Sequence, residues 1–273
     1  MLFAGFLFAS MGVFVKLGAE QFSFAELVFY RSLTGLAVIT LLVKSRGLSI
    51  RTIHWKAHAG RGVSGFVSLA LYFYSITLLP LPTAVTLNYT SPLFLAVLTV
   101  FLLGERPRTL LLIAVGLGFT GVVLLLRPAL SGHFWGVLLG LTSGFFAGVA
   151  YLNVTHLTRT LNEPEWRVVF YFSLTATLGA GVWVLLDEFH AMTLGNVWIL
   201  LGIGVTATIG QLAMTRAYGK GNTLTVGSMS YSTVVFSSLL TLIVWGQTLE
   251  VLSWLAIAII VAAGILGIKA APR

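Results

Sequence analysis

An arginine inside an apolar stretch is the first residue of this sequence that could do chemistry. Arg31 follows Leu27-Val28-Phe29-Tyr30 and precedes a second apolar run. An arginine within a membrane-spanning segment is rare and usually faces a cavity or a partner. Its planar guanidinium can donate two parallel hydrogen bonds to a carboxylate, which makes Arg31 a candidate substrate ligand. It could instead pair with Glu26, bond carbonyls at a helix end, or extend to the membrane surface.

Polar side chains of other apolar stretches could complete a site around Arg31. Tyr72 lies too deep for the interfacial position that lipid-facing tyrosines prefer, so its hydroxyl needs an interior partner or water. An amide in hydrocarbon, such as Gln211, has the same need. Each of these groups could equally bond one helix to another. The residues that we expect to bind substrate are Arg31, Tyr72, Asn88, Tyr89, Gln211 and Tyr231.

A proline interrupts the most polar of these stretches, Asn88-Tyr89-Thr90-Ser91-Pro92. Proline removes a backbone hydrogen bond, and carbonyls freed at membrane depth are tolerated only against protein or water. Ser230 occupies the corresponding stretch of the second half, which lacks the proline. We expect Asn88 nearer the outer face and Ser230 nearer the inner face, so that the two stretches could gate opposite sides; simple helix kinks are the alternative. The candidate gating or coupling residues are Pro92, Ser230 and His156.

Several kinds of site are excluded or disfavoured by what the sequence lacks. It has no cysteine, and its eight acidic residues fall in loops or near the ends of apolar runs. His54 and His58 are spaced four apart but lack a third ligand nearby, so a metal site is not expected. No glycine-rich phosphate loop is present. We therefore expect no enzyme activity, no cofactor and no metal, and a neutral to positive cavity that suits zwitterions or carboxylates.

The composition places nearly the whole chain in a membrane. Hydrophobic residues make up 58% of the 273 residues and charged residues 9%, whereas a soluble domain carries roughly 25% charged residues. Nucleic-acid binding is not expected, because the basic residues sit in short gaps between apolar runs. Apolar runs bounded by charge, proline or glycine predict ten spans. They cover about 1–18, 24–43, 60–79, 83–103, 109–126, 135–158, 166–186, 196–217, 223–245 and 252–270.

The basic residues also predict an orientation. With the amino terminus in the cytoplasm, 13 of the 16 lysines and arginines fall in inner loops or at the carboxyl terminus. This bias follows the positive-inside rule and favours an even number of spans, with both termini cytoplasmic. Arg61 is assigned to the inner loop after the second span in this scheme, and Glu105 to an ion pair with Arg106 or Arg108 at the inner surface.

The two halves of the chain resemble each other without a gap. From Gly60 to Glu250 identities recur at an offset of 142, and Val28–Thr34 resembles Val169–Thr175 at an offset of 141. Five spans per half is an odd number, so the second half would enter the membrane from the opposite side. We expect repeats at residues 1–127 and 134–273. Two inverted halves around a central pocket can open to either side, although a duplication kept only for packing is the alternative.

A stripe of glycines marks the sixth predicted span. Gly136, Gly140, Gly144 and Gly148 recur every four residues and therefore share one helix face. Small residues at this spacing let a neighbouring backbone approach closely, so the stripe predicts a packing surface.

Several motifs resemble the EamA family of the drug/metabolite transporter superfamily. The first half carries Phe29–Leu33, Pro82-Thr83-Ala84 before Ser91–Phe94, and Leu103-Gly104-Glu105-Arg106-Pro107. The second half carries weaker copies, Met229-Ser230-Tyr231 and Trp245-Gly246-Gln247, with Gln247 where the family commonly has glutamate. The resemblance covers essentially the whole chain. It implies a ten-helix inner-membrane carrier of small metabolites, often of amino acids that are moved outward.

Together these features predict an all-α membrane protein with ten transmembrane helices in two inverted five-helix repeats. We expect a secondary transporter in a bacterial inner membrane that exports amino acids or related carboxylates by alternating access. The alternatives are a passive channel, an uptake carrier for a nucleoside-like metabolite such as S-adenosylmethionine or a vitamin, and a scaffold that transports nothing. The expected partners are the substrate and the lipid bilayer, and the apolar fifth and tenth spans offer a surface for a homodimer.

Overall fold

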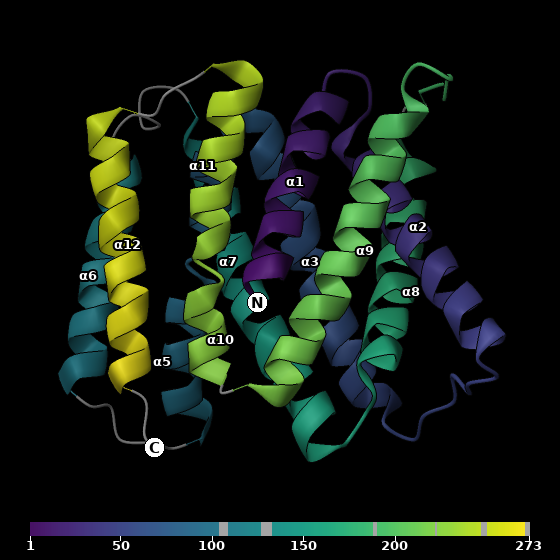
Figure 1. Cartoon of the computed structure of the whole chain (residues 1–273), viewed down its shortest axis with the longest axis horizontal. Coiled ribbons are helices and arrows are strands. Elements are labelled where there is room, and N and C mark those ends of the chain that lie inside the picture. Colours follow the sequence, from purple (N-terminus) through teal and green to yellow (C-terminus); the bar gives the residue numbers. More distant parts are fainter. Residues whose placement is uncertain (104–108, 127–132, 188–189, 222, 247–249, 271–273) are drawn as a thin grey trace.

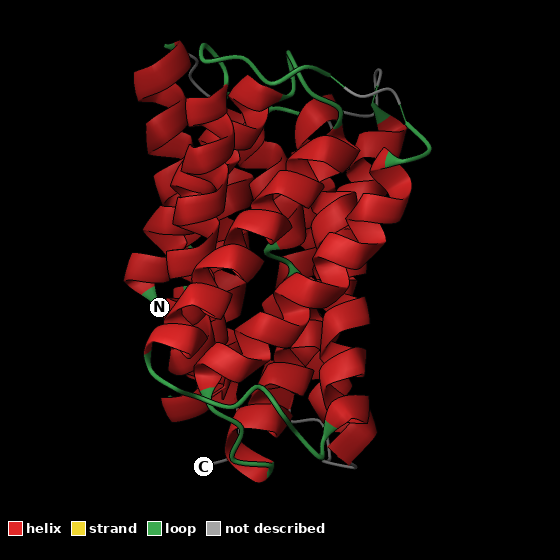
Figure 2. Ribbon diagram, turned by 90° about the vertical axis from the view of Figure 1, so that its right-hand side faces the viewer, coloured by secondary structure: helices red, strands yellow, loops and turns green. Residues whose placement is uncertain are grey.

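The computed structural model describes residues 1–103, 109–126, 133–187, 190–221, 223–246 and 250–270. Within these ranges the chain is helical, with no strand, and its loops gather at the two ends of the bundle (Figure 2). The prediction of an all-α protein is confirmed. The motif at Gly104–Arg108, including Glu105, and the position of Gln247 lie outside the described residues.

The first repeat contributes six helices (Figure 1). They are α1 (Leu2–Gly18), α2 (Phe24–Ser45), α3 (Trp55–Leu78), α4 (Leu81–Asn88), α5 (Ser91–Leu103) and α6 (Thr109–Leu126). The second repeat contributes α7 (Phe134–Thr155), α8 (Glu165–Val184), α9 (Val197–Lys220), α10 (Thr223–Met229), α11 (Ser232–Trp245) and α12 (Val251–Ala270). A π-helical turn, His156–Thr160, extends α7.

The helix boundaries reproduce the offset seen in the sequence. Helices α3 and α9 each have 24 residues and begin 142 positions apart, at Trp55 and Val197. The interrupted pair α4–α5 covers 81–103, and its counterpart α10–α11 covers 223–245, again 142 positions on. The two halves therefore share one succession of helices. If each interrupted pair is counted as one rod, the described helices form ten rods.

The packing between the halves is symmetric. Helix α3 packs on α7 and its equivalent α9 packs on α1, whereas α2 packs on its own equivalent α8, and α6 on α12. In Figure 1 the α6–α12 pair lies at one edge of the bundle and the α2–α8 pair at the other. One apolar core, which includes Val28, Phe73, Leu87, Ile203 and Val234, runs through both halves.

Both interrupted rods break next to a tyrosine. Helix α4 is capped at its end by Tyr89, and α11 is capped at its start by Tyr231, the equivalent residue. The break that Pro92 predicts is confirmed, and Pro92 sits in the first turn of α5, where proline is tolerated. The second break has no proline. There the hydroxyl of Ser230 donates to the carbonyl of Gly227, which offers that backbone a partner other than the helical ladder.

The glycine stripe of α7 receives the break between α4 and α5. A Cβ added at Gly144 would lie 2.8 Å from the carbonyl oxygen of Leu87 and 3.0 Å from that of Asn88. A Cβ at Gly148 would lie 3.1 Å from the carbonyl oxygen of Ser91. The predicted packing surface is confirmed, and it covers carbonyls that hydrocarbon could not satisfy.

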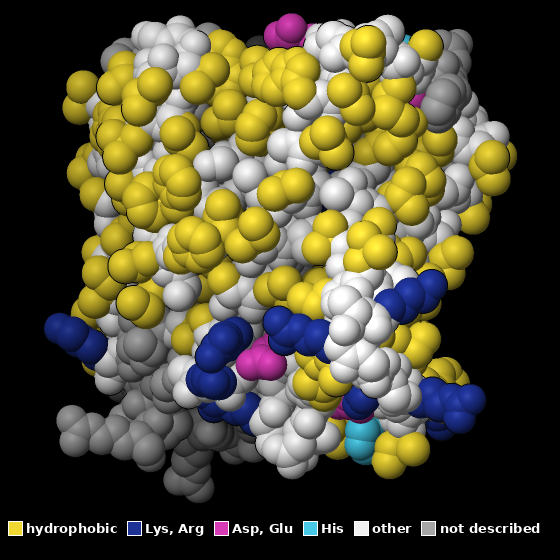
Figure 3. All heavy atoms as spheres, turned by 45° about the vertical axis from the view of Figure 1, so that its right-hand side comes forward, with side chains coloured by type: hydrophobic (Ala, Val, Ile, Leu, Met, Phe, Trp, Pro, Cys, Tyr) yellow, Lys and Arg dark blue, Asp and Glu magenta, His cyan; other side chains and the backbone are white. Residues whose placement is uncertain are grey.

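The outer surface fits a membrane. Among the described residues, five segments are long and apolar enough to cross a bilayer: Phe24–Ser45, Leu81–Leu98, Phe134–Thr160, Glu165–Val184 and Val197–Lys220. Figure 3 shows hydrophobic side chains over most of one face, with lysine and arginine side chains gathered toward one end. We call this end, which carries the loops 46–54 and 161–164, the basic end. That each of the ten rods crosses the membrane stays a prediction.

Candidate functional site

A cavity lies between the two repeats, within the helix bundle. It contains about 530 Å³ of space not occupied by atoms, part of it open to solvent. Clefts between the helices of a bundle are common sites for small-molecule binding. The side chains and glycine that line it come from α1, α2, α3, α4, α7, α8 and α9 and from the break after α4: Phe8, Met11, Arg31, Arg61, Gly65, Ser68, Leu69, Tyr72, Asn88, Tyr89, Ala147, Ala150, Tyr151, Phe172, Gln211 and Met214.

Arg31 reaches this cavity from α2. Its side chain is 4% exposed, and Nη2 lies 3.4 Å from Oε1 of Gln211 on α9. Its Cζ lies over the ring of Phe172 on α8, 5.0 Å from the ring centroid. Arg31 and Phe172 are 141 positions apart, so they are equivalent residues of the two repeats that contact each other where α2 packs on α8. Arg31 therefore faces the cavity and does not pair with Glu26.

Arg61 also lines the cavity, a position that the sequence did not predict. Its assignment to the inner loop is wrong, because α3 begins at Trp55 and not near residue 60. The earlier start puts Arg61 in the second turn, where it is 3% exposed and its Cζ lies 4.2 Å from the centroid of the Phe172 ring. The available signal was helical spacing: Arg61, Gly65, Ser68 and Tyr72 share one face of α3.

The two guanidiniums have no acidic partner among the described residues. The ion pairs of this part of the chain involve only Glu26 and Glu163, both at the ends of the bundle. Nε of Arg31, and Nε and Nη1 of Arg61, are buried without a hydrogen-bond acceptor. The cavity thus carries two positive charges without a negatively charged partner in the described part of the chain. Both guanidiniums share a favourable electrostatic contact with the face of the Phe172 ring.

Four of the other predicted ligands line the same cavity. Asn88 donates from Nδ2 to the hydroxyl of Ser143 on α7 at 2.9 Å, which fixes its amide against the glycine stripe. The hydroxyl of Tyr72 is buried without a partner, as is Nε2 of Gln211. Tyr89 stands at the break between α4 and α5. The structure thus brings Arg31, Tyr72, Asn88, Tyr89 and Gln211 together; whether they bind substrate stays a proposal.

Tyr231 and the candidate gating residues lie elsewhere. The ring of Tyr231 packs so closely on Gly264 of α12 that any side chain there would overlap it, and Tyr231 does not line the cavity. Pro92 lies beside Gly227, where the two interrupted rods meet. Ser230 is fully buried, whereas His156 is exposed on the π-helical turn, outside the cavity.

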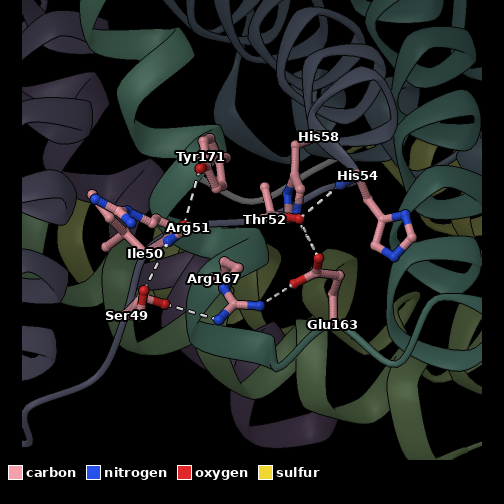
Figure 4. A network of polar contacts seen from close by, with 9 residues as sticks. All are labelled: Ser49, Ile50, Arg51, Thr52, His54, His58, Glu163, Arg167 and Tyr171. Atoms are coloured by element: carbon pink, nitrogen blue, oxygen red, sulfur yellow. Dashed lines mark hydrogen bonds and ion pairs between the residues drawn. The ribbon is translucent and has the colours of Figure 1, made fainter.

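At the basic end a network of polar contacts ties the α2–α3 loop of the first repeat to the second repeat (Figure 4). Glu163 accepts hydrogen bonds from the hydroxyl of Thr52 and, at 2.7 Å, from Nη1 of Arg167. Nη2 of Arg167 donates to the carbonyl of Ser49 at 2.8 Å, and the hydroxyl of Tyr171 donates to that of Ile50 at 3.0 Å. We call this network the basic-end strap.

A corresponding contact joins the two repeats at the opposite end. Glu26, in the first turn of α2, lies with Oε2 2.8 Å from Nδ1 of His190 and accepts the backbone N–H of His190 at Oε1, also at 2.8 Å. His190 belongs to the α8–α9 loop of the second repeat. We call the contact between Glu26 and His190 the opposite-end strap. Glu26 also accepts the backbone N–H of Ser23, because Ser23 and Glu26 form a capping box. The first turn of each of α2 and α8 thus meets the loop that follows the other, so the equivalent helices run in opposite directions.

Comparison with known proteins shows the family. The sequence profile of the EamA-like transporter family matches residues 1–127 and 134–268, one match for each half. The chain belongs to this family. A pseudopaline exporter of Pseudomonas aeruginosa is 31% identical over 255 residues, which cover 92% of this chain and 88% of the exporter.

Other relatives also span most of the chain. An uncharacterized transporter of Helicobacter pylori is 28% identical and covers 97% of this chain and 92% of its own length. A riboflavin transporter of Rhizobium johnstonii is 25% identical, with 97% and 88% covered. A solved crystal structure matches with a TM-score of 0.73 at 21% identity over 100% of this chain and 97% of that one, which shows a shared fold. The prediction of a two-repeat membrane transporter of the EamA family is confirmed.

Proposed function

We propose that this EamA-family transporter exports a small metabolite with a carboxylate group, an amino acid or organic acid, by alternating access. The observation that carries the proposal is the cavity between the repeats, where Arg31 and Arg61 present guanidinium groups without an acidic partner among the described residues. A guanidinium fork pairs with a carboxylate through two parallel hydrogen bonds. Export is the direction of the pseudopaline exporter, one of its relatives.

The two straps support alternating access. Each joins one repeat to the other, and they lie at opposite ends of the bundle around the cavity. A carrier that opens to one side and then to the other must release one such closure while it keeps the other. A passive channel would need both ends open at once.

The orientation belongs to the proposal. The basic end would face the cytoplasm of a bacterial inner membrane, because lysine and arginine are retained on that side. The chain has no cysteine, so single cysteines can report the topology. Ser45→Cys and Thr160→Cys, both exposed and near the basic end, should react with an impermeant maleimide only in inside-out vesicles. Labelling of the two positions from different faces would overturn the inverted arrangement.

Counterflow in proteoliposomes tests the transport itself. Vesicles preloaded with an amino acid, an organic acid or a nucleoside-like metabolite are given the same compound in labelled form outside, with and without a pH gradient. We expect a carboxylate compound to accelerate entry of its labelled form from the opposite side. Entry without trans-acceleration would indicate a channel, and trans-acceleration only by riboflavin or nucleoside-like compounds would replace the proposed substrate class.

A further inference from the structure

The described side chains that line the cavity include two arginines and no acidic residue. Arg31 and Arg61 are both at least 96% buried, and each lies over the ring of Phe172. From their distances to the ring centroid, the two Cζ atoms are no more than about 9 Å apart. Both side chains also line the same cavity, so a single small molecule bound there can contact both. Two buried like charges at this separation raise each other's free energy, and neither has the solvation it would have in water.

The acidic residues of neighbouring elements are already engaged. Glu26, on the same helix as Arg31, directs its oxygens to Ser23 and His190 at the helix start. Glu163 directs its oxygens to Thr52 and Arg167. Neither of these carboxylates is offered to the cavity, and no acidic side chain of the described residues lines it. Within the described part of the chain, the counter-charge is therefore left to the bound molecule or to solvent ions.

We propose that the cavity selects a small organic dianion, with one negative charge for each guanidinium. The inference rests on the proposed function and narrows its substrate class. An organic acid with one carboxylate would neutralise one guanidinium and leave the second buried and unpaired. A molecule with two acidic groups would pair both, and this pairing is the physical origin of the selectivity.

The rest of the lining suits the neutral part of such a molecule. The hydroxyl of Tyr72 and Nε2 of Gln211 are buried without partners in the same cavity, so they can hydrogen-bond uncharged polar groups. Met11, Leu69 and Met214 add an apolar wall that can contact a short carbon chain. No acidic side chain among the cavity-lining residues is available for a cationic substrate.

Thermal unfolding of the purified full-length protein, at constant ionic strength, measures the selectivity. The probes are succinate and glutarate as dicarboxylates, glycerol 3-phosphate as a phosphate monoester, and butyrate and alanine with a single carboxylate. The shift of the midpoint with ligand concentration gives the affinity. Because a hydrogen bond to a charged group contributes about 1.5–3 kcal/mol, we expect at least one dianion to bind about 10- to 100-fold more tightly than the single carboxylates. The dicarboxylate and phosphate arms identify which acidic group is preferred.

Two variants assign the effect to the guanidiniums. Arg31→Gln and Arg61→Gln should each weaken dianion binding by about 10- to 100-fold and bring the dianion affinity down toward that of a single carboxylate, since one guanidinium remains. Arg46→Gln, which removes an exposed arginine at the end of α2, is the matched control and should change neither affinity. A variant that lost both affinities equally would indicate general damage and overturn the assignment.

The variants also report on folding. Replacing an unpaired buried charge by an apolar side chain of similar length removes a desolvation cost, so Arg31→Met and Arg61→Met should unfold, without ligand, at or above the temperature of the unmodified protein. The dianion inference would be overturned if compounds with one and two acidic groups bound equally, or if the dianion preference survived either glutamine variant. The proposed function, a carrier of carboxylate compounds, would be unaffected by either result. If no carboxylate bound but riboflavin did, the proposed function would fail as well.

Discussion

Glu26 and Arg167 are equivalent residues of the two repeats, 141 positions apart, and each holds a loop of the other repeat at opposite ends of the bundle. Glu26 receives His190 from the α8–α9 loop, and Arg167 reaches Ser49 in the α2–α3 loop, which is the equivalent loop. One position thus carries opposite charges in the two halves while making the same kind of contact. Because the contacts at the two ends involve different residues, a substitution can weaken one end without touching the other.

Weakening one strap should shift the carrier toward the state that is open on that side. In a protein carrying Ala147→Cys as a cavity reporter, Glu163→Gln should speed labelling from the basic end, and Glu26→Gln should speed labelling from the opposite end. A lost charge-assisted hydrogen bond of about 1.5–3 kcal/mol corresponds to an approximately tenfold or larger shift in the populations. Rates with an impermeant maleimide, measured in vesicles of each orientation, check this. Equal acceleration from both sides would count against gating by the straps.

The basic-end strap should survive mild acid. Burial raises the pKa of Glu163, but hydrogen bonds from Thr52 and Arg167 and the charge of Arg167 together lower it more. The pKa of Glu163 therefore lies below its ordinary value of 4.5. A carboxyl with a depressed pKa in the folded protein stabilises it above the unfolded value and loses this effect as the pH falls through the folded value. Between pH 8 and 5 Glu163 should stay ionised, so its titration should not change the rate at which Ala147→Cys is labelled from the basic end. The rate should rise only below pH 4.5, where Glu163 takes up a proton. Glu163→Gln is the control, because it has no carboxyl to titrate; a rise between pH 7 and 5 that Glu163→Gln abolishes would contradict the expectation.

A methyl group on the α7 stripe should destabilise the fold. In Gly144→Ala the new Cβ would meet the carbonyl oxygens of Leu87 and Asn88 at 2.8 and 3.0 Å, and backbone cannot move aside as a flexible side chain can. Overpacking of this kind costs about 1–3 kcal/mol, seen as a lower midpoint of thermal unfolding in detergent. Gly116→Ala on α6, where a Cβ has nothing within 4 Å, should be close to neutral. Equal midpoints for the two variants would mean that the stripe does not hold the interrupted helix tightly.

Gly65 should matter for ligand binding rather than for folding. A Cβ at Gly65 would overlap Nη1 of Arg61 and lie 2.8 Å from Cε2 of Phe172, so Gly65→Ala should displace the guanidinium from its place over the ring. We expect the dianion affinity to fall about tenfold or more, as when a charge-assisted hydrogen bond is lost. Gly60→Ala, whose Cβ would meet only ordinary contacts at 3.9 Å or more, is the control. The same ligand-dependent unfolding measurement checks both, and an unchanged affinity in Gly65→Ala would show that Arg61 can bind from another position.

Spacing and charge predicted much of this architecture, because lipid leaves few alternatives to helices. Hydrophobic runs located the ten rods, and the offset of 142 seen in the sequence recurs between the helix boundaries of the two halves. The start of α3 was missed, since Trp55 to Arg61 carries polar and basic residues that look like a loop when only apolar periodicity is considered. The offset of 142, applied to the span expected from residue 196, would have placed it next to Trp55. The error removed Arg61 from the candidate site. The packing of Tyr231 on Gly264 was also not predicted, because the neighbour that a side chain next to a break meets is decided by tertiary packing.

The contact of Arg31 with Phe172 has a consequence for how such a protein could arise. These equivalent positions meet where α2 crosses α8, so in a pair of identical chains the same residue would face itself: arginine would confront arginine, or phenylalanine would confront phenylalanine. A contact between a cation and an aromatic ring at this position requires that the two equivalent residues differ. The two copies must therefore have diverged before this contact could form, and within this chain the divergence is fixed, because one gene supplies both residues.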